Sequence, residues 1–289
     1  MIDLHPILGI DAVDLEPCVQ HPVPFLYDIP LRACVSRDVS NLMFAGRNIS
    51  ATHIAFAATR VMATCAVIGQ GVGVAAAHAA LEHILPAELA TRRDAILAIQ
   101  QQLLRNDAYL IGHDNQDDRD LARQAEVTAS SESPGGEAVQ VISGQTRSVH
   151  GDKGAPPARA CAGSHRWMSD PAQGLPASIR LDWKEPVAVA EIQLIFDTGL
   201  HRHLTLSHHD GYSSRMVWGE PQPETVRDYK VERFDGDHWH TVAEVTGNYQ
   251  RMRRHSLAES SPQLLSAIRV QVEQTNGLDH ARICEVRVT

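Results

Sequence analysis

The stretch Ser178-Ile179-Arg180-Leu181-Asp182-Trp183 decides the fold of the larger part of this chain, because apolar and polar side chains alternate along it. Successive side chains of a β-strand point to opposite faces, so such a segment has one face for a core and one for water. The same period of two returns at 190–196, 268–272 and 284–288. Many short strands with one apolar face predict an all-β domain, an antiparallel sandwich of the jelly-roll kind.

The first part of the chain differs, because Ala, Leu and Ile recur there at helical spacing. Residues 41–46 predict a short buried strand that ends at a glycine, and a long buried helix is expected within 60–84. A second helix is predicted at 91–105, with Thr91 as its cap. The apolar stripe of this second helix consists of Ile96, Ile99, Leu103 and Leu104.

The change from helical to strand periodicity divides the chain into two parts. Residues 112–157 are rich in Asp, Ser, Gly and Pro, which is typical of loops and linkers. We therefore expect a partial α/β domain at 1–118 and the β-sandwich at 119–289. Trp183, Trp239 and Phe234 fall in or beside predicted strands and are expected in the sandwich core, with a ligand platform as the less favoured alternative.

Composition excludes several classes of protein. A formal charge of -9 argues against a broad basic face, so no nucleic-acid partner is expected. The five cysteines are widely spaced without a CxxC pair, which predicts free buried thiols and no metal site. The apolar stretch 61–85 contains Gln70, His78 and Glu82 and indicates a buried helix, so no membrane partner is expected. No signal peptide follows Met1, which predicts a cytoplasmic protein if Met1 is the true start.

A glycine motif in this helix resembles a dinucleotide fingerprint. Gly71-Val72-Gly73-Val74-Ala75-Ala76 fits the G-x-G-x-x-G/A pattern, but the second strand that the pattern requires does not appear before Gly112. The alternative is one helix whose small residues allow a neighbouring strand or cofactor to approach closely. The residues at this spacing are Gly69, Gly73, Ala76, Ala77 and Ala80.

Two runs carry a family resemblance. Asn41-Leu42-Met43-Phe44-Ala45-Gly46-Arg47-Asn48-Ile49-Ser50-Ala51-Thr52-His53, and the later run from Arg60 to Ala77, resemble the C-terminal segment of bacterial FAD-dependent oxidoreductases. The resemblance covers about residues 25–80. It implies FAD as cofactor, with the strand that ends at Gly46 as the last parallel strand of the FAD domain.

The resemblance also implies a set of cofactor-binding residues around the flavin. Its members are Gly46, Arg47, Ser50, Arg60, Val61, Met62 and Gly69. The N-terminus of a helix near Arg60 would face the flavin ring, because its unpaired N–H groups and partial positive charge stabilise the anionic reduced form. Arg60 is a catalytic candidate that can hold an anionic substrate group. His53 is the acid–base candidate, and an equally weighted alternative gives it only a hydrogen bond to loop backbone.

The second part resembles discoidin-like, galactose-binding domains. The resemblance lies in the opening at 125–131, in the closing at 281–288, and in Trp167 and Trp239 between them. It implies a glycan ligand bound by loops at one end. Arg251, Arg253 and Arg254 with His255 form a local basic cluster, read either as an anionic-sugar site or, with more weight, as a solvated loop.

An FAD domain also needs an early βαβ unit whose glycine-rich turn holds the pyrophosphate, and none precedes Tyr27. We therefore expect this chain alone to bind FAD weakly or not at all and to be inactive. Three hypotheses stay open: a C-terminal fragment of a flavin oxidoreductase, a carbohydrate-binding protein with a non-catalytic flavoprotein remnant, and a pairing protein. The expected partner is accordingly a missing N-terminal FAD-binding half or a separate subunit.

Overall fold

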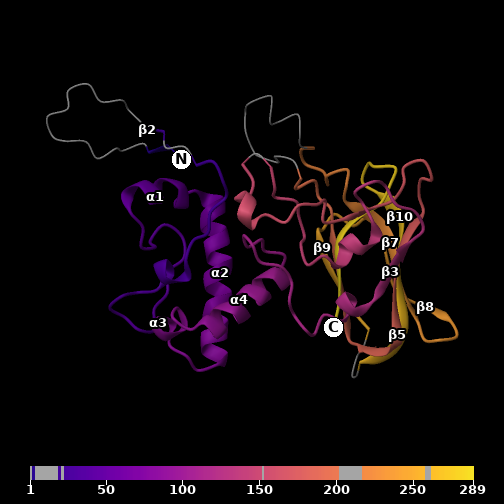
Figure 1. The fold of residues 1–289 in the computed structure, drawn as a ribbon, viewed down its shortest axis with the longest axis horizontal. Helices are drawn as coiled ribbons and strands as arrows, with labels where there is room; N and C mark the ends of the chain where they lie inside the picture. The colour runs from indigo at the N-terminus through magenta and orange to yellow at the C-terminus, as the bar shows by residue number, and fades with distance from the viewer. Residues whose placement is uncertain (1, 4–18, 21–22, 152, 202–216, 258–261) are drawn as a thin grey trace. The chain divides into compact units, whose positions relative to one another are not determined.

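A computed structural model describes residues 2–3, 19–20, 23–151, 153–201, 217–257 and 262–289. The chain divides into two compact units. The first consists of Met1–His113 and His150–Ala160, and the second of Asp114–Val149 and Cys161–Thr289. The α-helices belong to the first unit and the long strands to the second (Figure 1), which confirms the predicted pairing of a partial α/β region with an antiparallel jelly-roll sandwich.

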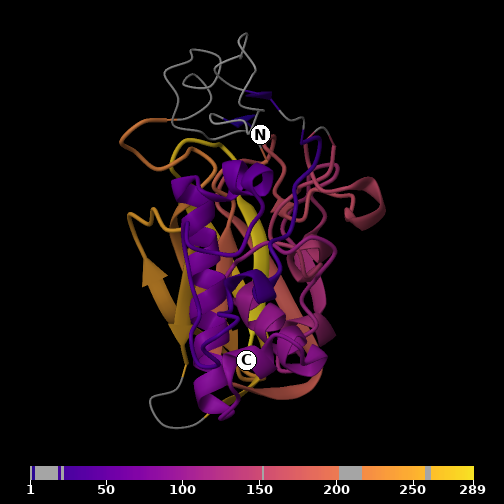
Figure 2. The ribbon, with the colours of Figure 1, turned by 90° about the vertical axis from the view of Figure 1, so that its left-hand side faces the viewer.

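The described part of the first unit is mostly helical. Its α-helices are α1 (His53–Thr59), α2 (Met62–Leu81), α3 (Pro86–Leu89) and α4 (Arg93–Arg105). It also contains the short 3-10 helices η1 (Leu31–Cys34) and η4 (Pro157–Arg159) and a two-residue strand pair, β1 (Ile2–Asp3) and β2 (Val19–Gln20). Figures 1 and 2 show α2 as the longest helix of this unit.

The strand predicted at 41–46 is absent from the structure, and with it the expected last parallel strand. Met43 makes only an isolated antiparallel bridge to Val35, and the Phe44 N–H donates to the Cys34 carbonyl at 2.7 Å. A strand needs a neighbour to complete its ladder, and the described residues of this unit supply none for 41–46. The apolar side chains of this segment instead pack onto α2, since Phe44 joins Ile49 and Ile68 in a small cluster.

Helix α4 follows its prediction closely. It begins at Arg93 and not at Thr91, whose hydroxyl donates to the Glu88 carbonyl at 2.8 Å and caps nothing. Ile99, Leu103 and Leu104 are buried as predicted, and Ile96 is partly buried. The apolar stripe of α4 packs on α2 through Ala75 and Ala79.

Helix α2 is far less buried than its composition predicts. Of its 20 residues, only Ile68, Ala75 and Ala79 are buried. By length and composition alone α2 is also apolar enough to cross a membrane, as are many core helices of soluble proteins. The prediction of a buried helix is therefore wrong for the described structure, because little of the described chain covers α2.

The eleven residues His150–Ala160 join the first unit through specific contacts. The Leu26 N–H donates to the Gly154 carbonyl at 2.9 Å. Arg159 forms an ion pair with Asp28 at 2.8 Å and also donates to the Ile111 carbonyl. The chain thus leaves the second unit and returns to it.

The second unit is a sandwich of two antiparallel sheets. One sheet has the order β3-β5-β10-β7-β8 and the other β4-β11-β6-β9. The strands of the first sheet are β3 (Glu126–Ala129), β5 (Ala177–Val189), β7 (Val226–Phe234), β8 (Trp239–Val245) and β10 (Gln263–Thr275). Those of the second are β4 (Trp167–Met168), β6 (Glu191–Phe196), β9 (Met252–Ser256) and β11 (Arg282–Val288). The short 3-10 helices η2 (Leu121–Gln124) and η3 (Ala138–Ile142) contact β11.

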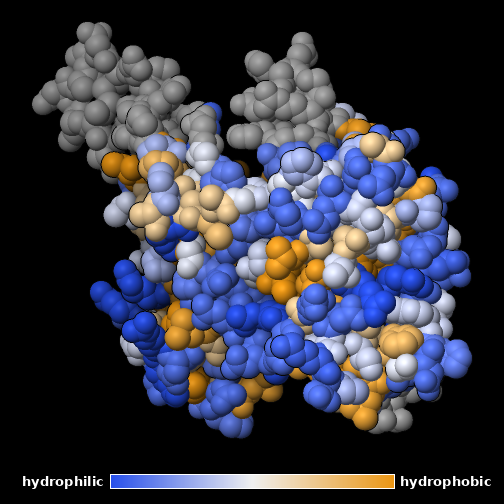
Figure 3. Space-filling view, turned by 45° about the vertical axis from the view of Figure 1, so that its right-hand side comes forward, coloured by the Kyte–Doolittle hydropathy of each residue, from blue (hydrophilic) through white to orange (hydrophobic). Residues whose placement is uncertain are grey.

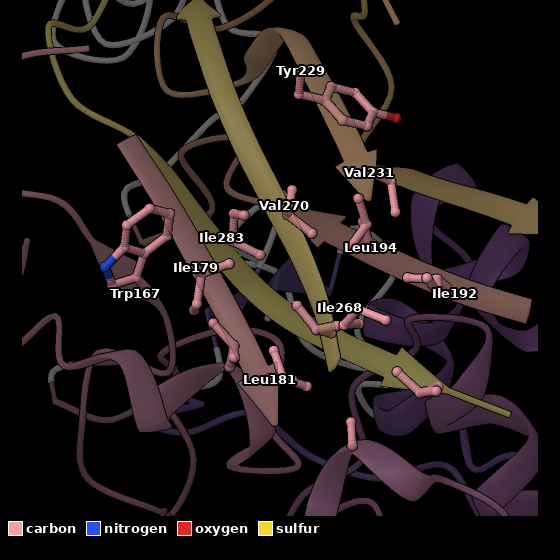
Figure 4. Packing of buried hydrophobic residues seen from close by; sticks show 14 of the residues in the cluster. Trp167, Ile179, Leu181, Ile192, Leu194, Tyr229, Val231, Ile268, Val270 and Ile283 are labelled. Carbon is pink, nitrogen blue, oxygen red and sulfur yellow. The ribbon is translucent and has the colours of Figure 1, made fainter. Parts of the chain in front are cut away.

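The inner faces of the two sheets share one core (Figure 4). Ile179 and Leu181 of β5 are fully buried, as the alternation predicted, and face side chains of β6 and β11 such as Leu194 and Ile283. Outside the grey atoms, the face drawn in Figure 3 is mainly hydrophilic with small hydrophobic patches. In β5 one side faces the core, as expected for a sandwich, whereas β6 and β11 are buried on both sides.

Two of the three aromatic residues predicted for the core lie elsewhere. Trp183 is buried, but Trp239 and Phe234 are only partly buried and contact each other with ring centroids 5.2 Å apart. The guanidinium of Arg269 lies over the Trp239 ring at 4.5 Å. These rings sit at the β7–β8 hairpin, where a cation–π contact takes the place of core packing.

The cysteines match their prediction in part. The four described cysteines are free thiols, and Cys34 and Cys284 are buried. Cys65 is partly buried and Cys161 exposed. Cys18 lies outside the described residues.

Candidate functional site

The first predicted group of cofactor residues lies in one turn that follows Phe44. Gly46 has φ +100°, a conformation that favours glycine because it carries no Cβ. Arg47 and Ser50 are exposed, and the Ser50 N–H donates to the Ala33 carbonyl at 2.8 Å. The turn is thus shaped by backbone bonds and leaves the side chains of Arg47 and Ser50 on the surface.

The second group lies at the junction of α1 and α2. His53 begins α1, whose N-cap Thr52 accepts a hydrogen bond from the Ala55 N–H at 3.3 Å. Arg60 is the C-cap of α1, and Val61 is the N-cap of α2 without a capping side-chain bond. The structure therefore places Arg60, Val61 and Met62 together, as their sequence implies.

The N-terminus of α2 is open to solvent. Met62, its first residue, is 88% exposed, and Val61 is exposed as well. The first N–H groups of a helix have no intrahelical partner, and the helix carries about half a positive charge at this end. This end of α2 therefore has the chemistry to hold a negative charge.

Gly69 lies apart from that junction. It comes seven positions after Met62, which is about 10 Å along a helix axis. The surroundings of Gly69, Gly71 and Gly73 are open, since a Cβ placed on any of the three meets no described atom within 4 Å. Gly69 thus belongs to the side of α2 and not to its tip.

The small residues of α2 form an exposed apolar face. Exposed positions recur every three or four residues, so they share one side of the helix. We call this the open face of α2, and its residues are Ala63, Ala66, Val67, Gln70, Gly73, Ala76, Ala77 and Ala80. Gln70 is its sole polar side chain. Of the five small residues predicted to allow close approach, Gly73, Ala76, Ala77 and Ala80 are on this face.

In the sandwich, the basic cluster predicted at 251–255 is not a solvated loop. It forms most of β9, where alternate side chains point to opposite sides. Arg251 donates to the backbone carbonyls of Phe196 and Thr146 at 2.8 and 2.7 Å, and Arg254 donates to Gln193 at 3.1 Å. His255 is buried and lies 3.0 Å from the Tyr229 hydroxyl. The interpretation as a solvated loop is therefore wrong, because these groups bond to other parts of the sandwich.

An exposed tyrosine stands out on the loops at one end of the sandwich. Tyr249 is 68% exposed, yet its neighbours are firmly held. Asn248 is buried and donates to the Val226 carbonyl at 2.8 Å, and Asn276 donates to the Asn248 carbonyl at 3.1 Å. An aromatic ring is thereby presented to solvent from a rigid loop. Sequence reasoning missed it, because Tyr249 lies outside every motif quoted above.

A buried ionic cluster also escaped the sequence analysis. Asp197 lies directly after β6, Arg166 directly before β4, Arg282 at the start of β11, and His201 four residues after Asp197. Burial alone would raise the pKa of Asp197, but contact with His201 and the charge of Arg166 outweigh it and hold that pKa below its usual range. These residues are far apart in sequence, so no local pattern could have joined them.

Comparison with known proteins finds a family model that is similar to the first part of the chain. Residues 1–103 match the model of a family described as FAD dependent oxidoreductase. No curated protein matches the chain. The resemblance that the sequence indicated for this region is thereby confirmed.

Solved structures match the sandwich. The family 32 carbohydrate-binding module of C. perfringens NanJ, solved with galactose, shares 16% sequence identity, covers 58% of this chain and 94% of that one, and has a TM-score of 0.39. The family 32 module of Streptococcus pneumoniae EndoD shares 18% identity over 59% of this chain and 98% of that one, with a TM-score of 0.40. A chitosan-binding module from Paenibacillus sp. IK-5 shares 15% identity over 59% and 98%, with a TM-score of 0.39. Both resemblances predicted from the sequence therefore have counterparts among known proteins.

The residues present fit part of an FAD site. The uncapped, exposed N-terminus of α2 suits an anionic ring edge, and the glycines of α2 leave room for a close neighbour. The described residues of this unit lack the strand–turn–helix that holds a pyrophosphate. The fit is therefore to the flavin end of the cofactor and not to its ADP end.

Proposed function

We propose that the first unit is the part of an FAD-dependent oxidoreductase that closes the flavin site, and that the open face of α2 packs on a dinucleotide-binding sheet. That sheet lies outside the described residues, on an adjoining segment or on a separate subunit. The observation that supports the proposal is an apolar, glycine-containing helix face that the described chain leaves uncovered.

The composition of α2 is costly for a helix that stays exposed. A glycine in a helix interior destabilises it by about 0.5–1 kcal/mol relative to alanine, and α2 contains three. Exposed apolar surface adds to the unfavourable terms. Close packing of another backbone on this face would explain both the glycines and the exposed apolar surface, because it needs small residues and buries the apolar side chains. In flavoproteins with parallel sheets, helices cover the sheet faces in this way.

Each predicted site residue then has a role. FAD, if held here, would supply the hydride acceptor for the substrate. The N–H groups at the start of α2, near Val61 and Met62, stabilise negative charge at the ring, and Gly46, Arg47 and Ser50 shape the adjoining turn. Gly69 admits the close neighbour. Arg60 holds an anionic substrate group. His53 holds or moves a proton, because a histidine ring can both donate and accept one.

Flavin retention tests the proposal. The chain purified alone should lack the flavin absorbance band, whereas the chain tagged in its native host should retain flavin. Ala77→Leu on the open face should abolish this retention. Ala87→Leu, at an exposed position of α3, is the matched control and should preserve it. Equal flavin in the two variants would contradict the proposed face, and a yellow protein from the chain alone would contradict the need for a second unit.

A second candidate function is glycan binding by the sandwich, and Tyr249 favours it. Tyr249 is 68% exposed, and hydrogen bonds already fix the loop that carries it. Little conformational entropy is therefore lost when a ligand binds to this ring. Sugar rings present C–H faces that stack on such a ring. In a glycan-array experiment, Tyr249→Ala should weaken binding about tenfold, corresponding to about 1.4 kcal/mol. Tyr27→Ala, an exposed tyrosine of the first unit, should leave binding unchanged.

A further inference from the structure

The second unit exposes two aromatic rings at one end of the sandwich. Among its described aromatic side chains, only Trp218, at 52%, and Tyr249, at 68%, are exposed. Trp218 lies in the segment that leads into β7, and Tyr249 lies in the loop between β8 and β9. Strands β7 and β8 are antiparallel neighbours, so the start of β7 and the end of β8 lie side by side. Both rings are therefore carried by loops at this end.

Hydrogen bonds join the loop of Tyr249 to the segment before β7. The Asn248 N–H donates to the Arg227 carbonyl at 2.8 Å, which places Tyr249 beside the first residues of β7. The side chain of Asn276, from the loop after β10, donates to the carbonyls of Thr225 and Asn248 at 2.9 and 3.1 Å. One amide group thus links the two segments that carry the rings.

The backbone beside Trp218 is held as well. The Gln222 side chain accepts the Val217 N–H at 3.2 Å and donates to the Val217 carbonyl at 2.9 Å. The Thr225 N–H in turn donates to the Gln222 carbonyl at 3.0 Å. These bonds close two successive turns between Val217 and Thr225, so the ring is presented from an ordered backbone. Less conformational entropy is then lost when a ligand binds.

Polar side chains are exposed beside each ring. Gln250 directly follows Tyr249, Glu220 comes two residues after Trp218, and both are exposed. A sugar presents C–H faces that stack on aromatic rings, and hydroxyl groups that bond to amides and carboxylates. The centre of a protein interface is instead depleted of charged residues. The mixture of ring faces and polar groups therefore fits a sugar better than a protein partner.

We propose that Trp218 and Tyr249 stack on two different sugar units of one oligosaccharide. The inference rests on the proposed glycan binding and deepens it, because it names the ligand as an oligosaccharide and adds a second contact. A sugar chain that is already held at Tyr249 reaches the second ring within the same molecule, which raises the overall affinity. A monosaccharide gains nothing from that ring.

Chain length tests the inference on the full chain. Calorimetry compares galactose with galactotetraose, glucose with cellotetraose, and N-acetylglucosamine with chitotetraose. In the series that binds, the tetrasaccharide should bind about tenfold or more tightly than its monosaccharide. Trp218→Ala should remove this gain and leave the monosaccharide affinity unchanged, whereas Tyr249→Ala should weaken both. Leu264→Ala, the matched control, removes an exposed apolar side chain at the start of β10, the opposite end, and should change neither.

Trp218 also reports its own contact. It is the most exposed of the four tryptophans, since Trp167 and Trp183 are buried and Trp239 is partly buried. Iodide, a quencher that stays in water, should therefore act mainly on Trp218. The tetrasaccharide should protect this emission, and the monosaccharide should not. Trp218→Phe should remove the protection but keep the tighter binding, because a phenyl ring still stacks on a sugar.

The outcomes separate this inference from glycan binding itself. Equal affinity for monosaccharide and tetrasaccharide, or a gain that survives Trp218→Ala, overturns the second contact and leaves glycan binding intact. A monosaccharide that protects Trp218 as fully as the tetrasaccharide places one sugar on both rings and also overturns it. Binding of no sugar overturns both proposals. Because the quenching comparison uses the unaltered chain, it holds even if a variant fails to fold.

Discussion

Alanine at the α2 glycines should stabilise the free chain. Gly73 lies on the open face, and the Cβ of an alanine there meets no described atom within 4 Å. The new methyl group therefore causes no clash, while the unfolded chain loses backbone freedom. We expect Gly73→Ala to raise the free energy of unfolding by about 0.5–1 kcal/mol, and alanine at Gly69, Gly71 and Gly73 together to raise it by about 1.5–3 kcal/mol.

The positions of the tryptophans make this measurement specific. All four, Trp167, Trp183, Trp218 and Trp239, belong to the second unit, whereas the described α-helices belong to the first. Urea unfolding followed by circular dichroism at the helix band reports the first unit, and tryptophan fluorescence reports the sandwich. Gly73→Ala should shift the first curve and leave the second unchanged. In a thermal scan the same variant should raise the midpoint by about 2–8 °C.

The same substitution at Gly136 is the control with the opposite sign. A Cβ there would lie 2.6 Å from Cβ of Met168, so Gly136→Ala should destabilise the sandwich by about 1–3 kcal/mol. Its effect should appear in the fluorescence curve. If Gly73→Ala destabilises the helical unit, some part of the chain already packs on the open face, and the reasoning behind the proposed function is refuted.

Further predictions concern the sandwich. Burial lowers the pKa of His255 to about 4, below the value of about 6.5 in the unfolded chain. The folded state therefore favours neutral His255, so stability from this group is complete above about pH 6.5 and is lost as the pH falls toward 4, by roughly 2–3 kcal/mol. Urea curves by fluorescence at pH 7.5 and 4.5 measure this, and His255→Gln should flatten the difference. Leu181→Ala should cost about 2–5 kcal/mol because Leu181 is fully buried in the core, whereas exposed Leu264→Ala should stay within about 0.5 kcal/mol in the same assay. Asp120→Ala should also destabilise the sandwich by about 2–4 kcal/mol, because its carboxylate accepts bonds from Asn115, Ala122 and Val288; an unchanged midpoint would contradict this.

Local periodicity predicted the parts of the fold that local rules control. The alternation at Ile179 and Leu181 is a property of one strand, and it identified the face that packs in the core. The sequence also predicted the apolar stripe of α4, since the buried residues of this helix repeat at helical spacing. In both cases the partner is another element of the same unit.

Predictions failed where the outcome depends on a distant partner. Residues 41–46 have the composition of a strand, but a strand forms only beside another, and the described chain offers none there. Helix α2 has the composition of a buried helix, but burial requires something to cover it. The Asp197 cluster brings together residues from the ends of three strands. The loop that presents Tyr249 is held by a hydrogen bond from Asn276, which lies on another loop. No local pattern contains this information.

The return of His150–Ala160 to the helical unit has a consequence for cleavage. A single protease cut between the units, for example near residue 114, would leave this eleven-residue segment on the C-terminal piece while its bonds to Leu26, Asp28 and Ile111 belong to the N-terminal piece. The two fragments should therefore elute together under native conditions and part only in denaturant. A gene truncated at that point would yield a helical fragment without residues 150–160, which belong to the same compact unit.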